Sequence, residues 1–203
     1  MLNLHQDRTN RTLSLVHLGL FFGIILLQTW VPFLGYIAIP PLNITIIHVT
    51  VMIATLYLGI REGFLVGTFW GLNSLLRAYL MPTSPMYVYV FSSPLVSLLP
   101  RMIMPLLVGW FYHHGSSHLS HQWRLRLSGL MGSLLNTILV LGSIAIFKRA
   151  EYLQIQGADL NGLWKVLGGI ILVNGIPEAI FAAMAIPIII KALTHFEKGQ
   201  TLL

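Results

Sequence analysis

The sequence predicts an all-α integral membrane protein, a bundle of about six transmembrane helices that forms a single domain over residues 1–203. Apolar residues make up 56% of the 203 residues and charged residues only 9%, with a mean hydropathy of +0.78. Soluble domains carry roughly 25% charged residues. Six apolar stretches recur along the chain, each about long enough to cross a ~30 Å hydrocarbon core. We therefore expect lipid, rather than water, to face most of the exterior.

The expected spans are Thr12–Pro32, Ile44–Gly59, Glu62–Leu80, Ser92–Tyr112, Trp123–Phe147 and Trp164–Leu193. The second is short, and the last is long and contains Pro177 and Pro187, so we expect it to be kinked or partly interfacial. Transmembrane strands are not expected, because the apolar runs are too long and too continuous. The expected connections are a Gly/Pro loop over Phe33–Asn43, a turn at Ile60 and Arg61, and loops over Met81–Phe91, His113–Gln122 and Lys148–Leu163.

Lys and Arg residues flanking the spans predict that both termini are cytoplasmic, since cytoplasmic loops carry the excess of positive charge. With the N-terminus inside, three such residues are external: Lys148, Arg149 and Lys165. The cytoplasmic set is larger and comprises Arg8, Arg11, Arg61, Arg124, Arg126, Lys191 and Lys198.

Polar and charged side chains inside the spans predict a binding site. Span by span they are His48; Trp70, Asn73 and Arg77; Ser93, Ser97 and Arg101; Asn136; and Asn174 and Glu178. In the third, fourth and sixth spans they repeat at helical spacing and so share a face. The predicted orientation places them at the middle or in the outer half of the bilayer. Such groups are expensive in lipid and mark functional sites.

The charges in this set indicate the kind of ligand. Arg77 and Arg101 bring two positive charges and Glu178 one negative charge, so a surplus of positive charge favours an anionic ligand, ideally a carboxylate that arginine grips bidentately. Pro105 and Pro177 each free a backbone carbonyl near these residues, which is tolerated where it lines a cavity. Three alternatives stay open. Arg101 and Glu178 could form a structural ion pair, Arg77 could reach the outer surface, and single Asn or Ser residues could tie helices together.

Glycines repeat at spacing four on two spans. Gly63, Gly67 and Gly71 lie on the third span, where packing inside the bundle is the better interpretation. Gly19 and Gly23 on the first span fit either internal packing or a docking surface for another membrane protein.

The sequence contains no recognisable catalytic or nucleotide-binding motif, and we expect neither an enzyme nor a cofactor. It has no cysteine and no G-x-x-x-x-G-K-[ST] sequence. His113, His114, His118 and His121 resemble a metal cluster, but their Gly/Ser-rich surroundings favour a solvated loop, so no metal site is expected. The net charge of +6 is spread over span ends rather than gathered into a patch, which argues against nucleic-acid binding.

Several segments resemble the substrate-binding S components of energy-coupling factor (ECF) transporters, and most of all the pantothenate-specific members. These segments are Pro32–Asn43, Ile47–His48, Leu58–Gly59 with Gly63, Pro82–Pro85 and Ser93–Arg101. The resemblance covers roughly residues 12–195, and Ser93–Arg101 is its most specific part. The chain departs from the family pattern at the expected Ile60–Arg61 turn, where Pro-Lys is commoner in the family.

The resemblance implies six helices in a bacterial cell membrane, a vitamin site that opens outward, and loops one and three acting as a lid. It also implies a small-residue stripe on the first helix, here Gly19 and Gly23 where many members have alanine. That stripe would dock on a transmembrane coupling protein driven by two ATPases. The alternatives are an S component for pyridoxine or hydroxymethylpyrimidine, or a membrane scaffold subunit that transports nothing.

Overall fold

The computed structural model describes residues 2–39, 42–115, 119–157 and 160–200. Apart from one short β-hairpin, the regular elements of these residues are helices, which confirms the predicted helical bundle. The helices are α1 (Leu2–Trp30), α2 (Ile47–Tyr57), α3 (Ile60–Leu80), α4 (Pro94–Ser97), α5 (Leu99–His114), α6 (His121–Phe147), α7 (Arg149–Gln156), α8 (Leu160–Ile170) and α9 (Ile176–Gln200). Two π-helical segments, η1 (Tyr87–Phe91) and η2 (Ile171–Gly175), precede α4 and α9. Strands β1 (Tyr36–Ile39) and β2 (Leu42–Thr45) pair as an antiparallel hairpin.

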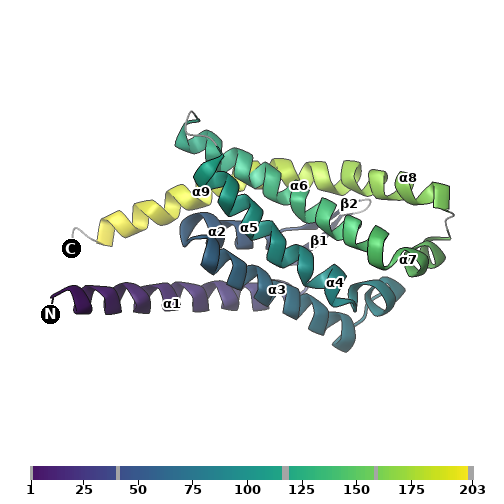
Figure 1. Ribbon diagram of the computed structural model, residues 1–203, viewed down its shortest axis with the longest axis horizontal. Coiled ribbons are helices and arrows are strands. Elements are labelled where there is room, and N and C mark those ends of the chain that lie inside the picture. The colour runs from purple at the N-terminus through teal and green to yellow at the C-terminus, as the bar shows by residue number, and fades with distance from the viewer. Residues whose placement is uncertain (1, 40–41, 116–118, 158–159, 201–203) are drawn as a thin grey trace.

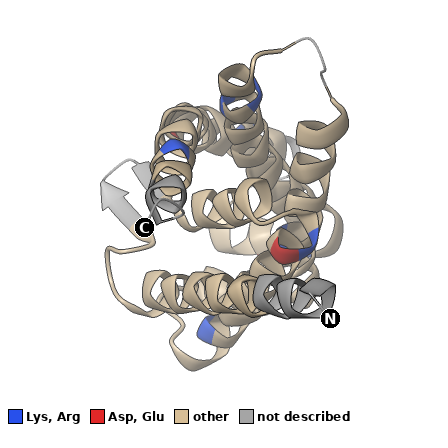
Figure 2. Ribbon diagram, turned by 90° about the vertical axis from the view of Figure 1, so that its left-hand side faces the viewer, with Lys and Arg blue, Asp and Glu red and all other residues tan. Residues whose placement is uncertain are grey.

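Both termini lie at one end of an elongated bundle (Figure 1). The end of α5 and the start of α6 lie toward this end, whereas the C-terminal end of α3, η1, α7 and the start of α8 lie at the other (Figure 1). Viewed from the terminal end, the described ribbon carries few charged residues, and these are scattered over several helices (Figure 2). Four of the described helical stretches are long and apolar enough to cross a membrane: Thr12–Trp30, Pro94–His114, His121–Phe147 and Gly162–His195.

Helix α2 is the buried centre of the bundle. It has only 11 residues, and those from Ile47 to Thr55 are all buried. It contacts α1, α3, α5, α6 and α9, and its apolar side chains form much of the larger hydrophobic core. Because protein rather than lipid surrounds it, α2 does not need the length of an independent membrane span.

The glycines of α3 are sites of close helix packing. A Cβ at Gly63 would collide with Thr55 of α2, and a Cβ at Gly67 would collide with the backbone carbonyl oxygen of Arg101 on α5. Pro105, inside α5, lacks the N–H that would normally bond this carbonyl. The α3 backbone therefore packs directly on the carbonyl that the proline frees.

The glycines of α1 face open space instead. No atom lies within 4 Å of a Cβ built at Gly19 or Gly23. The same helix exposes large apolar side chains, with Leu15 68% and Leu20 60% exposed. The first glycine stripe therefore does not pack inside the bundle, whereas the third-span stripe does.

Several predicted connections differ from the structure. The turn predicted at Ile60 and Arg61 is wrong, because α3 already begins at Ile60. The chain turns at Leu58 and Gly59, where a φ of 127° favours glycine. The predicted Gly/Pro loop contains the β1–β2 hairpin, and the predicted loop after α6 contains α7.

In the last predicted span, the π-helical segment η2 separates α8 from α9 just before Pro177, whereas Pro187 lies inside α9. A π-helical segment inserts extra backbone into one turn, and such segments are frequent at functional sites. Segment η2 contains Asn174 and ends at Gly175. The regular helix α9 begins at Ile176, so Pro177 and Glu178 lie in its first turn.

The packing of α3 leads to a testable prediction. Gly67→Ala should destabilise the protein by about 1–3 kcal/mol, because the new methyl group meets a backbone carbonyl that moves only with its helix. Gly19→Ala is the matched control, and should leave stability unchanged or slightly raised, since alanine is the better helix former. Thermal unfolding of both variants in the same detergent measures the difference. Equal unfolding midpoints would contradict the packing role of Gly67.

Candidate functional site

A cavity of about 560 Å³ lies among the hairpin, α3, η1 and the helices from α5 to α9. Its polar wall consists of Tyr36, Thr45, Trp70, Ser74, Arg77, Thr83, Tyr87, Arg101, Asn136, Thr137, Tyr152, Asn174 and Glu178. Its apolar wall consists of Met86, Phe91, Val140, Leu141, Ile144 and Ile170. Small-molecule sites in proteins are typically cavities of about 300–1,000 Å³, and this cavity falls within that range.

Arg101 is the most deeply buried cation in this wall. Only 7% of the residue is exposed. Its Nη1 donates a hydrogen bond to the Val96 carbonyl at 2.5 Å, and its guanidinium carbon lies 5.1 Å from the centre of the Trp70 ring. Its Nε is buried and has no hydrogen-bond partner among the described residues. The guanidinium therefore keeps donor capacity for a group inside the cavity.

Arg77 lines the same cavity with its guanidinium differently engaged. Its Nη1 donates to the Thr29 carbonyl of α1 at 2.8 Å. Its guanidinium carbon also lies 5.0 Å from the centre of the Tyr36 ring, on β1. Arg77 thus connects three elements, namely α3, the end of α1 and the hairpin.

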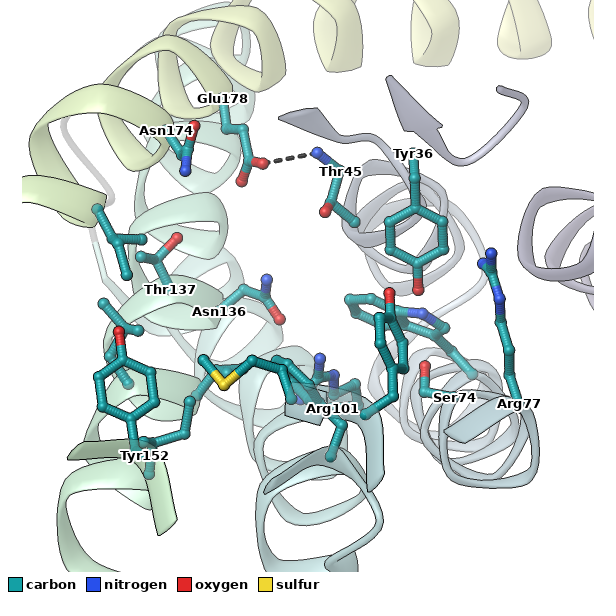
Figure 3. Close-up of a pocket in the computed structure, with 18 of the residues that line it drawn as sticks. Tyr36, Thr45, Ser74, Arg77, Arg101, Asn136, Thr137, Tyr152, Asn174 and Glu178 are labelled. Atoms are coloured by element: carbon teal, nitrogen blue, oxygen red, sulfur yellow. Dashed lines mark hydrogen bonds between the residues drawn. The ribbon is translucent and has the colours of Figure 1, made fainter. Parts of the chain in front are cut away.

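Glu178 lies on the α9 side of the cavity. One carboxylate oxygen, Oε1, accepts a hydrogen bond from the Thr45 backbone N–H at 2.6 Å (Figure 3). The residue is only 5% exposed. The ion pair between Arg101 and Glu178 considered above does not form, since within the described part of the chain the one ion pair joins Lys148 to Glu151.

Buried polar atoms without partners cluster at this cavity. They are Trp70 Nε1, Ser74 Oγ, Arg101 Nε, Asn136 Oδ1 and Tyr152 Oη, none of which has a hydrogen-bond partner among the described residues. Leaving such a group unsatisfied costs about 1–3 kcal/mol. These atoms belong to residues of α3, α5, α6 and α7 that line the cavity.

Three residues predicted for the site lie outside the cavity wall. Asn73 accepts a hydrogen bond from Trp30 Nε1 at 3.1 Å and donates to the Phe69 carbonyl at 2.9 Å. Ser97 donates to the Phe91 carbonyl. His48 is fully buried on α2, in the centre of the bundle. Their proposed part in binding stays a prediction, and the contacts of Asn73 and Ser97 are those of structural residues.

Six predicted residues do line the cavity: Trp70, Arg77, Arg101, Asn136, Asn174 and Glu178. Ser74 was not predicted, although it lies four residues after Trp70 and so shares its helix face. Tyr36 and Thr45 were not predicted either, because no helical periodicity marks residues in a hairpin.

The loop histidines make contacts with aromatic residues. His114 stacks on Trp110, and His121 Nδ1 lies 3.3 Å from the Tyr112 hydroxyl. No group of three or more metal-ligating side chains gathers anywhere in the described ranges. His118 lies outside the described residues.

Comparison with known proteins identifies the family. Residues 13–190 match the model of the ECF transporter, substrate-specific component family. The chain is 33% identical to the pantothenate transporter PanT of Leuconostoc mesenteroides subsp. mesenteroides, an alignment that covers 82% of the chain and 91% of that protein. It is 27% identical to the pantothenic acid transporter PanT of Lactococcus lactis subsp. cremoris, over 87% of the chain and 91% of that protein.

These relatives are bacterial transporters, and the apolar helices described above have the length to cross a membrane. The protein is accordingly a multi-pass protein of the cell membrane. It belongs to the family of substrate-specific components of ECF transporters.

Proposed function

We propose that this chain captures pantothenate from outside the cell and delivers it for ATP-driven uptake powered by partner subunits. The proposal depends chiefly on the buried guanidinium of Arg101. It lies at the wall of a ligand-sized cavity, and its Nε has no hydrogen-bond partner among the described residues. A buried cation without an acidic partner favours a ligand that brings its own negative charge. The two relatives named as pantothenate transporters give the identity of that anion.

The chemistry of pantothenate matches the wall of the cavity. Its carboxylate is placed at Arg101, where the planar fork allows a bidentate contact. Its amide and two hydroxyls are assigned to Asn136, Asn174 and Glu178, the last through the carboxylate oxygen that Thr45 does not occupy. Pyridoxine and hydroxymethylpyrimidine carry no carboxylate, and so they leave the charge of Arg101 uncompensated. A scaffold subunit would need no such cavity.

Substitution of Arg101 tests this assignment directly. Removing one partner of a buried charge pair costs about 2–5 kcal/mol. Arg101→Gln should therefore weaken pantothenate binding roughly 30- to 4,000-fold, at 1.4 kcal/mol per decade. Arg101→Lys should also lose affinity, because an ammonium does not reproduce the planar fork. Titration calorimetry on the purified protein measures both.

The comparison ligand is pantothenol, in which a neutral hydroxymethyl group replaces the carboxylate. It should bind the wild-type protein poorly, and Arg101→Gln should reduce its affinity much less than that of pantothenate. Equal losses for both ligands would make Arg101 a structural residue and would overturn the anionic assignment.

The proposal includes an orientation, with about six membrane helices and both termini in the cytoplasm. It is supported by the Lys/Arg asymmetry and by the two termini lying at one end of the bundle (Figure 1). Because the chain lacks cysteine, single cysteines report topology without background. A cysteine at Gln156 should react with an impermeant maleimide from outside intact cells. One at Ser120 should react only after permeabilisation, and the reverse pattern would overturn the orientation.

The open face of α1 is proposed to dock on the transmembrane coupling protein, which two ATPases drive. Gly19 and Gly23 face no other part of the described chain, and small residues allow close helix approach in lipid. The double substitution Gly19→Leu with Gly23→Leu should abolish complex assembly and uptake while pantothenate affinity is retained. Co-purification with the coupling protein and calorimetry measure the two effects separately. Parallel loss of binding and uptake would contradict a docking role.

A further inference from the structure

The two arginines of the cavity differ in how their guanidinium groups are engaged. Arg101 has a buried Nε without a partner among the described residues. Arg77 is held by two elements that lie far from it in sequence: it donates to the Thr29 carbonyl at 2.8 Å and lies 5.0 Å from the Tyr36 ring centre. A guanidinium that already stacks on one element and bonds another is suited to hold them together.

The Tyr36 contact falls at a defined place in the hairpin. Tyr36 and Thr45 are register partners, and both line the cavity. Arg77 of α3 lies against Tyr36, while Glu178 of α9 accepts the Thr45 N–H at 2.6 Å. The base of the hairpin is thus held from two sides of the cavity by side chains of opposite charge, as the close-up shows (Figure 3).

Arg77 also belongs to a joint between α3 and the last turn of α1. The last carbonyls of a helix lack partners within that helix, and Arg77 satisfies that of Thr29. One residue further on, Trp30 Nε1 donates to Asn73 Oδ1 at 3.1 Å. Asn73 and Arg77 are four residues apart and so share one face of α3. Because Asn73 contributes to this joint from outside the cavity, its substitution tests the joint without removing a residue from the cavity wall.

We propose that Arg77 is a positioning residue, which fastens the end of α1 and the base of the hairpin to α3, and that Arg101 alone binds the ligand carboxylate. The proposal rests on the proposed function and refines it, because it divides the work of two cations in the same wall. Loss of Arg77 loosens the hairpin that completes the cavity and so lowers the affinity for every ligand by the same factor. Loss of Arg101 removes the contact with the carboxylate and so lowers the affinity for the anionic ligand only.

The test compares Arg77→Gln with Arg101→Gln, using pantothenate and pantothenol as ligands. A hydrogen bond to a charged group contributes about 1.5–3 kcal/mol. Arg77→Gln should therefore lower the affinity for both ligands roughly 10- to 100-fold and leave the ratio of the two affinities unchanged. It should also raise the dissociation rate constant of each. Partial unfolding would lower the number of sites without changing that rate constant. Arg77→Lys, which retains a donor for Thr29, should recover part of the loss.

Asn73→Leu is the matched control, since it breaks the Trp30 contact without altering the cavity wall. It should also lower the affinity for both ligands equally, by a smaller factor than Arg77→Gln does. Selective loss of pantothenate in Arg77→Gln would show that Arg77 is a second carboxylate ligand and would overturn the proposal. Unchanged affinity for both ligands would overturn it as well.

Hydrogen–deuterium exchange of the ligand-free protein separates this proposal from the proposed function. Amides of the two hairpin strands, residues 36–39 and 42–45, should exchange faster in Arg77→Gln and Asn73→Leu than in the wild type, and at the wild-type rate in Arg101→Gln. This result would support the positioning role even if the wild type failed to bind pantothenate. Hairpin exchange that is unchanged in Arg77→Gln would overturn it whatever the ligand.

Discussion

The contact between α3 and α5 at Gly67 is the constraint on which the site depends. Pro105 deprives the Arg101 carbonyl of its helical donor, and the absence of a side chain at Gly67 lets the α3 backbone pack on that carbonyl. One helical turn beyond Gly67, Trp70 then lies close enough for its ring to face the Arg101 guanidinium at 5.1 Å. A wider separation of the helices would remove the aromatic face that helps to stabilise a buried cation.

Most of the fold could be predicted from the sequence, because lipid imposes simple rules on length and polarity. Each predicted span contains a helix, and the family assignment is confirmed. The short second span was recognised, but hydropathy alone does not reveal that protein surrounds it on most sides. The turn was misplaced because the charged pair Arg61 and Glu62 interrupts the apolar run, although arginine is a good helix former and α3 already begins at Ile60. The hairpin was missed because a short strand pair between helices has no periodicity long enough to detect.

The site was partly predictable for a related reason. Polar residues at membrane depth are rare, so Arg101, Asn136 and Glu178 were conspicuous without any structure. Which neighbour each polar group meets is a long-range property. Asn73 and Arg77 share one face of α3, yet Asn73 bonds to Trp30 outside the cavity while Arg77 lines it. Only the positions of α1 and the hairpin distinguish the two.

The short central helix has a consequence for how the protein is made. At 1.5 Å per residue the 11 residues of α2 extend about 17 Å, well short of a ~30 Å hydrocarbon core. As it emerges from the ribosome, this segment has too little apolar length to be retained in the bilayer by itself. Its stable insertion depends on α3, which follows after a two-residue turn, and on the later helices that surround it. We therefore expect insertion of α2 to be cooperative with that of its neighbours, which early truncations of the chain lack.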